Sequence, residues 1–229
     1  MLRGAIALCG LLLAFEVRAQ VSGSLTLVSD YRYRGVSLSD ENPAAQASVA
    51  YDHSSGWYAG AFGSSVDVSG QSRRDLQLLS YFGYASRAGE RLTWEAGASY
   101  YAFTGGGGYD YPEVYWGLAS TNVSGRIYYA PRYFGQRAGV VYAELNAERP
   151  LIYRLHAIGH IGILRLDSQS ASSYGSGRYR FDVRAGIGVD LDQLSLRLTW
   201  LAADASNGAY PVSESRNRTA VTMSMSRAF

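Results

Sequence analysis

Charged side chains stand at alternate positions in many stretches of this chain, and these residues could do chemistry. In the stretch 30–40, Asp30, Arg32 and Arg34 alternate with Tyr31 and Tyr33. Successive side chains of a β-strand point to opposite faces, so the charges of such a stretch would share one face. Guanidinium and carboxylate groups gathered on one face could select ions, or could pair with one another.

If the polar faces line a common lumen, arginines gather near the point where the first and last strands meet. We expect Arg32 and Arg34 to lie near Arg218, opposite a wall of carboxylates that runs from Glu95 to Glu144. One hypothesis is a lumen that favours anions, and the alternative is a set of ion pairs that only hold the wall together. The predicted lumen-lining charged residues are Asp30, Arg32, Arg34, Glu95, Glu113, Arg126, Glu144, Arg154, Arg180, Asp182, Arg184, Arg197 and Arg218.

Two histidines, His156 and His160, share a face of one predicted strand. Four residues of a strand span about 13 Å, which is too far for one metal ion without another ligand between them. Serines are abundant, but no motif singles one out as a nucleophile with a histidine and an acid. We therefore predict no metal site, no cofactor and no catalytic residue.

The elements that must position these charges are β-strands, because the alternation of apolar and polar residues recurs about a dozen times. Most of the segments are about ten residues long, which fits a tilted strand that crosses a membrane. The predicted fold is an all-β, up-and-down antiparallel transmembrane β-barrel of about twelve strands. Its expected strands are 23–34, 45–52, 57–68, 76–84, 91–102, 113–118, 123–129, 141–147, 153–164, 178–190, 194–200 and 218–229.

The connections between these strands alternate between short and long, as do the periplasmic turns and outer loops of bacterial outer-membrane barrels. This pattern places both termini in the periplasm. Aromatic residues gather near predicted strand ends, where Tyr and Trp would lie at the two membrane interfaces. The aromatic residues expected to flank outer loops are Tyr100, Tyr101, Phe103, Tyr109, Tyr111, Tyr128, Tyr129, Tyr133 and Phe134. Those expected beside short turns are Trp57, Tyr58, Tyr84 and Tyr153.

Residues 1–19 have a basic start, a short apolar middle and small residues before Gln20, which is typical of a secretory signal peptide. The predicted domains are thus the signal peptide, 1–19, and the barrel, 20–229. Cleavage would remove the single cysteine, Cys9, so no disulfide is expected. The formal net charge of the whole chain is +2, all its basic residues are arginine, and this balance argues against binding nucleic acid.

The residues Asp30 to Ser37, followed by Asp40, Pro43 and Gln46, resemble the opening motif of the proteobacterial TorF-like porin family. Two further blocks, 57–60 and 64–67, resemble the next motif of that family. The resemblance covers roughly the first 50 residues after the signal peptide and implies an outer-membrane barrel that acts as a porin. It supplies no catalytic residues.

We therefore predict a bacterial outer-membrane porin through which small hydrophilic solutes diffuse passively, with a slight anion preference. One alternative is a closed structural or adhesion-type barrel that acts through its outer loops, and a weaker one is a lipid-modifying enzyme. The expected partners are outer-membrane lipids, the solutes, and the barrel-assembly machinery. The last of these would recognise the C-terminal strand with Phe229 as its insertion signal.

Overall fold

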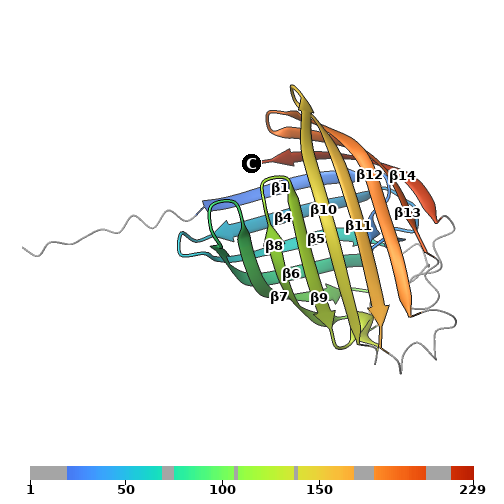
Figure 1. Ribbon diagram of the computed structural model, residues 1–229. Helices are drawn as coiled ribbons and strands as arrows, with labels where there is room; N and C mark the ends of the chain where they lie inside the picture. The colour runs from blue at the N-terminus through green and yellow to red at the C-terminus, as the bar shows by residue number, and fades with distance from the viewer. Residues whose placement is uncertain (1–19, 69–74, 106–107, 137–138, 168–177, 205–217) are drawn as a thin grey trace, which may run out of the picture.

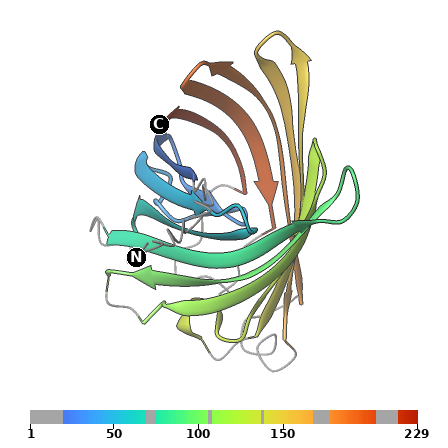
Figure 2. The same ribbon diagram turned by 90° about the vertical axis from the view of Figure 1, so that its left-hand side faces the viewer.

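The computed structural model of the chain describes residues 20–68, 75–105, 108–136, 139–167, 178–204 and 218–229. Within these residues, twelve antiparallel strands close into a single barrel (Figures 1 and 2). The barrel strands are β1 (Gln20–Val28), β4 (Ala44–Asp52), β5 (Trp57–Val66), β6 (Asp75–Arg87), β7 (Thr93–Phe103), β8 (Tyr111–Ala119), β9 (Val123–Ala130), β10 (Val140–Ile152), β11 (Leu155–Leu166), β12 (Tyr179–Leu191), β13 (Leu194–Ala203) and β14 (Thr219–Ala228). The predicted fold class is confirmed. The predicted signal peptide lies outside the described residues and stays a prediction.

Each barrel strand pairs with its neighbour along the chain, and β1 pairs with β14 to close the ring. The closure registers Ser24 with Ala228 and Val28 with Ser224. Beyond the end of β14, Phe229 exchanges two backbone hydrogen bonds of 3.0 Å with Gly23. No strand edge is left unpaired around this ring, which is what a barrel needs where no water is available to the backbone.

The connections are short at one end of the barrel and longer at the other, as predicted. The short turns are 53–56, 88–92, 120–122, 153–154 and 192–193, and both chain ends of the barrel lie with them (Figure 1). At the other end, which we call the loop end, the connections include the 3-10 helix η1 (Tyr133–Gly135) and a small hairpin of β2 (Arg32–Tyr33) and β3 (Val36–Ser37). No helix among the described residues is long and apolar enough to cross a membrane.

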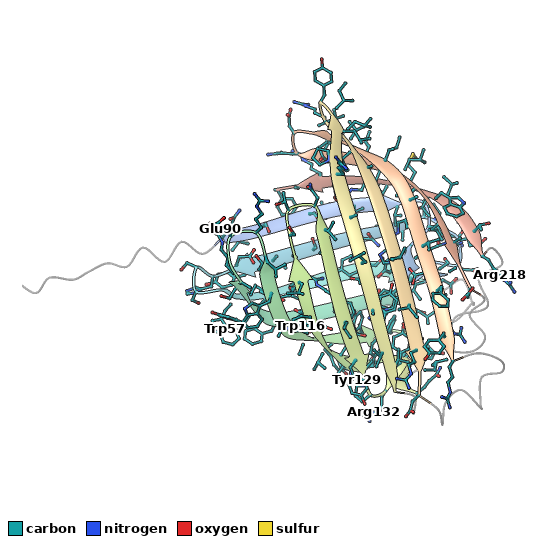
Figure 3. All side chains as sticks on the ribbon, viewed as in Figure 1. Trp57, Glu90, Trp116, Tyr129, Arg132 and Arg218 are labelled. Carbon is teal, nitrogen blue, oxygen red and sulfur yellow. The ribbon has the colours of Figure 1, made fainter. Side chains whose placement is uncertain are left out.

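The outer face of the barrel is an apolar belt. Exposed hydrophobic side chains alternate along the strands, as in Leu25 and Leu27 of β1 or Phe181 and Val183 of β12. Trp57 lies toward the short-turn end and Tyr129 toward the loop end (Figure 3). An outward apolar band with aromatic residues toward both ends is typical of barrels that lie in a membrane.

Two of the predicted wall assignments are wrong. The first wall strand is β1, which ends at Val28, and the stretch from Asp30 to Asp40 is not part of the wall. In β5 the predicted apolar outer face is reversed, because Phe62 packs against Tyr31 and Val66 is buried in an interior cluster. Both errors arise at the loop end, where apolar side chains face inward.

The belt can be tested with two adjacent residues of β4, the outward-facing Val49 and the inward-facing Ser48, whose hydroxyl bonds Ser24. We expect Val49→Arg to lower the free energy of unfolding by about 2–4 kcal/mol, because it places a charge in the apolar band. Ser48→Arg should change it by much less. Reversible urea unfolding from lipid vesicles measures both, and equal effects would contradict the assignment of the two faces.

Candidate functional site

The candidate site is a hairpin that folds into the barrel from the loop end, and we call residues 30–39 the inward hairpin. Its two short strands, β2 and β3, are joined by Arg34 and Gly35, which both have positive φ angles of 50° and 82°. A two-residue turn with both central residues at positive φ is typical of tight hairpins, and glycine is favoured there. The chain thus turns back on itself inside the lumen.

The inward hairpin is held in shape by Asp30, whose side chain is buried. This carboxylate accepts hydrogen bonds from Arg32 Nε at 2.6 Å and from Ser37 Oγ at 2.6 Å. Ser39 Oγ lies 3.3 Å from the same carboxylate and accepts a bond from the backbone N–H of Tyr31. These bonds explain why polar residues alternate in this stretch although it is not part of the wall.

The tip of the inward hairpin crosses the lumen and forms an ion pair with the opposite wall. Arg34 Nη2 lies 2.7 and 2.8 Å from the two carboxylate oxygens of Glu113, which is on β8. The side chains of Arg34 and Glu113 are only 5% and 0% exposed. Charge-assisted hydrogen bonds of this length are among the stronger polar contacts in proteins, and here they are shielded from water.

Four tyrosine rings surround the Arg34 guanidinium. Its central carbon lies 4.3 Å from the ring centre of Tyr142, 4.8 Å from Tyr33, 5.1 Å from Tyr128 and 5.4 Å from Tyr133. These distances are within the range of cation–π contacts, which strengthen when the cation is desolvated. The rings therefore replace part of the water that Arg34 loses on burial.

Around this cage the loop end of the lumen is filled by a cluster of buried hydrophobic residues, which we call the aromatic plug. It joins apolar residues of the inward hairpin and of η1 to the inner face of the wall. Its members are Val36, Leu38, Val66, Val68, Tyr101, Phe103, Tyr111, Ala130, Tyr133, Phe134, Val140, Tyr142, Leu164 and Leu166. The prediction that Tyr101, Phe103, Tyr111, Tyr133 and Phe134 lie at the membrane interface is therefore wrong, since all five are buried inside the barrel.

The short-turn half of the lumen is polar and partly exposed, and we call it the vestibule. There Arg126 Nε lies 2.5 Å from Glu95, and Tyr58 donates a hydrogen bond of 2.8 Å to the same carboxylate. Tyr128 donates a hydrogen bond of 2.9 Å to Glu144. The vestibule ends at the aromatic plug.

A buried histidine network joins the vestibule to the base of the plug. His160 Nε2 lies 2.7 Å from Asp182, and Tyr142 donates to the same carboxylate at 3.0 Å. Asn146 Oδ1 lies 2.7 Å from His160 Nδ1. Gly35 at the hairpin tip packs here, because a Cβ atom on it would lie 2.9 Å from that of Asp182.

The predicted arginine-rich wall is not present as such. Arg32 and Arg34 lie in the inward hairpin and bind carboxylates, so neither lines the wall near Arg218. Arg218 is exposed beyond the loop end of the wall (Figure 3), and Arg154 is exposed in a short turn, where it pairs with Asp192. The predicted residues that do project inward from the wall are Glu95, Glu113, Arg126, Glu144, Arg180, Asp182, Arg184 and Arg197.

Sequence reasoning missed the hairpin, although a signal for it was present. Gly35 separates two short alternating runs, Tyr31–Arg34 and Val36–Ser39, as expected for a tight hairpin. The sequence pattern also does not predict that His156 lies beside Glu148 and Asp190. These residues come from three different strands, and the spacing within one strand does not reveal such a contact.

A family model and solved structures place this barrel among known proteins. The model of the family described as "bacterial protein of unknown function (Gcw_chp)" matches residues 16–229, so the chain belongs to this family. A search of curated proteins finds no match. The finer resemblance to TorF-like porins stays a prediction.

Solved porin structures share the fold. A structure titled "KdgM porin" is 8% identical, with a TM-score of 0.57 over 91% of this chain and 99% of that chain. A NanC porin structure is 10% identical, with a TM-score of 0.58 over 92% and 99%. A KdgM porin in complex with disordered oligogalacturonate is 6% identical, with a TM-score of 0.55 over 92% and 99%. At these identities the likeness is one of fold, a porin-like barrel.

The buried ion pair gives a testable prediction about the inward hairpin. We expect Arg34→Met or Glu113→Leu alone to loosen the hairpin, because each leaves one charge buried without its partner, which costs about 3–5 kcal/mol. The variant that carries both substitutions should loosen the hairpin less than either single variant, because neither charge is then left buried alone. Deuterium uptake of the peptide 30–42, with a peptide from β12 as the internal reference, measures the effect. Unchanged uptake in both single variants would contradict it.

Proposed function

We propose that this protein is a gated outer-membrane porin for small hydrophilic solutes, in which the inward hairpin is the gate. One observation carries the proposal: the inward hairpin, tied to the far wall by the Arg34–Glu113 pair, packs with η1 and the wall to fill one end of a lumen whose other half is polar and partly exposed. The porin-like fold of the barrel supports it.

The inward hairpin is well placed to move, because the barrel does not need it for closure. Strands β1 and β4 pair directly with each other from Gln20 opposite Asp52 to Val28 opposite Ala44. The hairpin lies in the connection between these paired strands. Its displacement would therefore leave every ladder hydrogen bond of the ring in place.

The energetic balance of the closed state also suits a gate. Burying a guanidinium and a carboxylate costs desolvation energy that their attraction offsets only when the geometry is good. If the hairpin swings out, both charges regain water while the apolar residues of the plug become exposed. Opposing terms of this kind leave a difference of a few kcal/mol between two states, which is the range in which a minor open state is populated.

The cellular setting is part of the proposal. The signal peptide, residues 1–19, would direct export, and the apolar belt would contact outer-membrane lipids. Phe229 follows β14 and pairs with Gly23 of β1. It would be the signal by which the barrel-assembly machinery recognises the final strand. The short turns would then face the periplasm and the plug would face outward.

Conductance in planar bilayers tests the gate directly. We expect the refolded protein to show rare discrete openings, and Glu113→Gln to raise the open fraction by at least about tenfold, because Arg34 is then left buried without its carboxylate. Arg126→Gln is the matched control, since it breaks an ion pair in the vestibule that does not touch the hairpin.

Folding of each variant is checked by its shift in migration on heating in detergent gels. Folded wild-type and Glu113→Gln proteins that both give no openings would contradict the gated porin. That result would favour the closed barrel that acts through its outer loops, an alternative supported by the dense packing of the aromatic plug.

The slight anion preference rests on two arginines of the vestibule wall. Arg34 and Arg126 lie 2.7 and 2.5 Å from carboxylate oxygens. Arg184 is half-buried on the lumen side, and Arg197 pairs with Glu148 at the longer distance of 3.5 Å. We expect Arg184→Gln with Arg197→Gln to shift the reversal potential in a salt gradient toward cation preference.

Arg154→Gln removes an arginine outside the lumen and serves as the control for this measurement. The two vestibule arginines do not set the ion preference if the reversal potential of the double variant stays unchanged. The same conclusion follows if Arg154→Gln shifts the reversal potential as much as the double variant does.

A further inference from the structure

Three neighbouring strands bring a histidine and two carboxylates together at the short-turn mouth of the lumen. Glu148 lies near the end of β10, His156 near the start of β11 and Asp190 near the end of β12. One ligand atom from each residue lies within 4.8 Å of the others. The cluster is at the opposite end of the lumen from the plug, so access to it does not depend on the gate.

His156 is the buried member of this cluster, with its side chain only 6% exposed. Its Nε2 lies 3.0 Å from Glu148 Oε1, yet the geometry there makes no hydrogen bond. Across the ladder His156 registers with Gly188, and a Cβ atom at Gly188 would collide with that nitrogen. The glycine therefore leaves the space that the imidazole occupies. A buried nitrogen that lacks a hydrogen-bond partner and lies beside a carboxylate is a candidate metal ligand.

The two carboxylates are accessible and partly oriented. The side chains of Glu148 and Asp190 are 46% and 55% exposed, so an ion could reach them from the short-turn side. Ser195 donates a hydrogen bond to Asp190 Oδ1, and Asp190 Oδ2 lies 3.5 Å from the second ring nitrogen of His156, Nδ1. Outer contacts of this kind fix the direction of a ligand. Arg197 lies 3.5 Å from Glu148, so its guanidinium would compete with a bound ion for this carboxylate.

We propose that Glu148, His156 and Asp190 form a binding site for a divalent transition-metal ion of the zinc class. One imidazole and two carboxylates match the nitrogen and oxygen donors that zinc accepts, and neighbouring ligand atoms around tetrahedral zinc lie roughly 3.3 Å apart. The imidazole disfavours magnesium and calcium, which prefer oxygen ligands alone. Water would complete the coordination from the vestibule. Bound metal would join β10, β11 and β12 at their short-turn ends.

Calorimetric titration of the refolded barrel with zinc chloride tests the site. We expect saturable binding near one ion per chain, which His156→Gln and Asp190→Asn each weaken by at least about tenfold. His53→Gln is the matched control, because His53 lies in a different short turn and belongs to no such cluster among the described residues. It should bind zinc as the wild type does.

Two further measurements distinguish the loss of a zinc site from the loss of the folded barrel. Zinc should raise the unfolding temperature of the wild type and of His53→Gln but not that of His156→Gln, because only a folded site gains from binding. Gly188→Ala, which changes no ligand, should also weaken binding by displacing the imidazole. The proposal is overturned if the wild type shows no saturable binding, or if folded His156→Gln binds zinc as tightly as the wild type.

Discussion

The ion pair between Arg34 and Glu113 is the interaction on which the interior of this barrel depends. Placing both charges away from water requires a compensating surround, and the four tyrosines around Arg34 supply it. It also requires that Arg34 reach the far wall, which the tight turn at Gly35 allows by keeping the inward hairpin narrow. The turn, the tyrosine cage and the buried carboxylate are thus parts of one arrangement.

That arrangement divides the lumen into two halves, which differ in the polarity of the side chains on the inner face of the wall. In the vestibule the inner face of the wall follows the usual rule for a membrane barrel, with polar side chains inside and apolar ones outside. At the loop end many inward side chains are apolar as well, because they pack against the inward hairpin and η1 instead of water. The likeness to porins is a likeness of fold, and it says nothing of the segment inside the wall.

The same division explains what could be predicted from the sequence. The wall follows a period of two, so its strands, short turns and most outward faces were predicted correctly. The errors in the outward faces lie where the rule of a polar lumen fails, as in Val66 of β5 and in Tyr111 and Tyr133, which are buried inside. The inward hairpin alternates polar and apolar residues as a wall strand does. Its polar residues bond Asp30, however, and its apolar residues belong to the plug. The Arg34–Glu113 pair joins residues 79 positions apart, and no local pattern contains such a contact.

A ring of twelve strands also explains why an inserted segment is needed at all. About eight strands enclose a space that side chains alone can fill, while 16 to 18 leave an open channel. In this intermediate ring, Val36 and Leu38 of the inward hairpin add apolar bulk at the loop end of the lumen, and Tyr33 packs against them. The single cysteine, Cys9, lies in the predicted signal peptide, so no disulfide would fix the hairpin. The hairpin is held by one ion pair, by aromatic packing and by hydrogen bonds such as the one that Tyr31 donates to Gln77. The movement required by the proposed gate would therefore break no covalent bond.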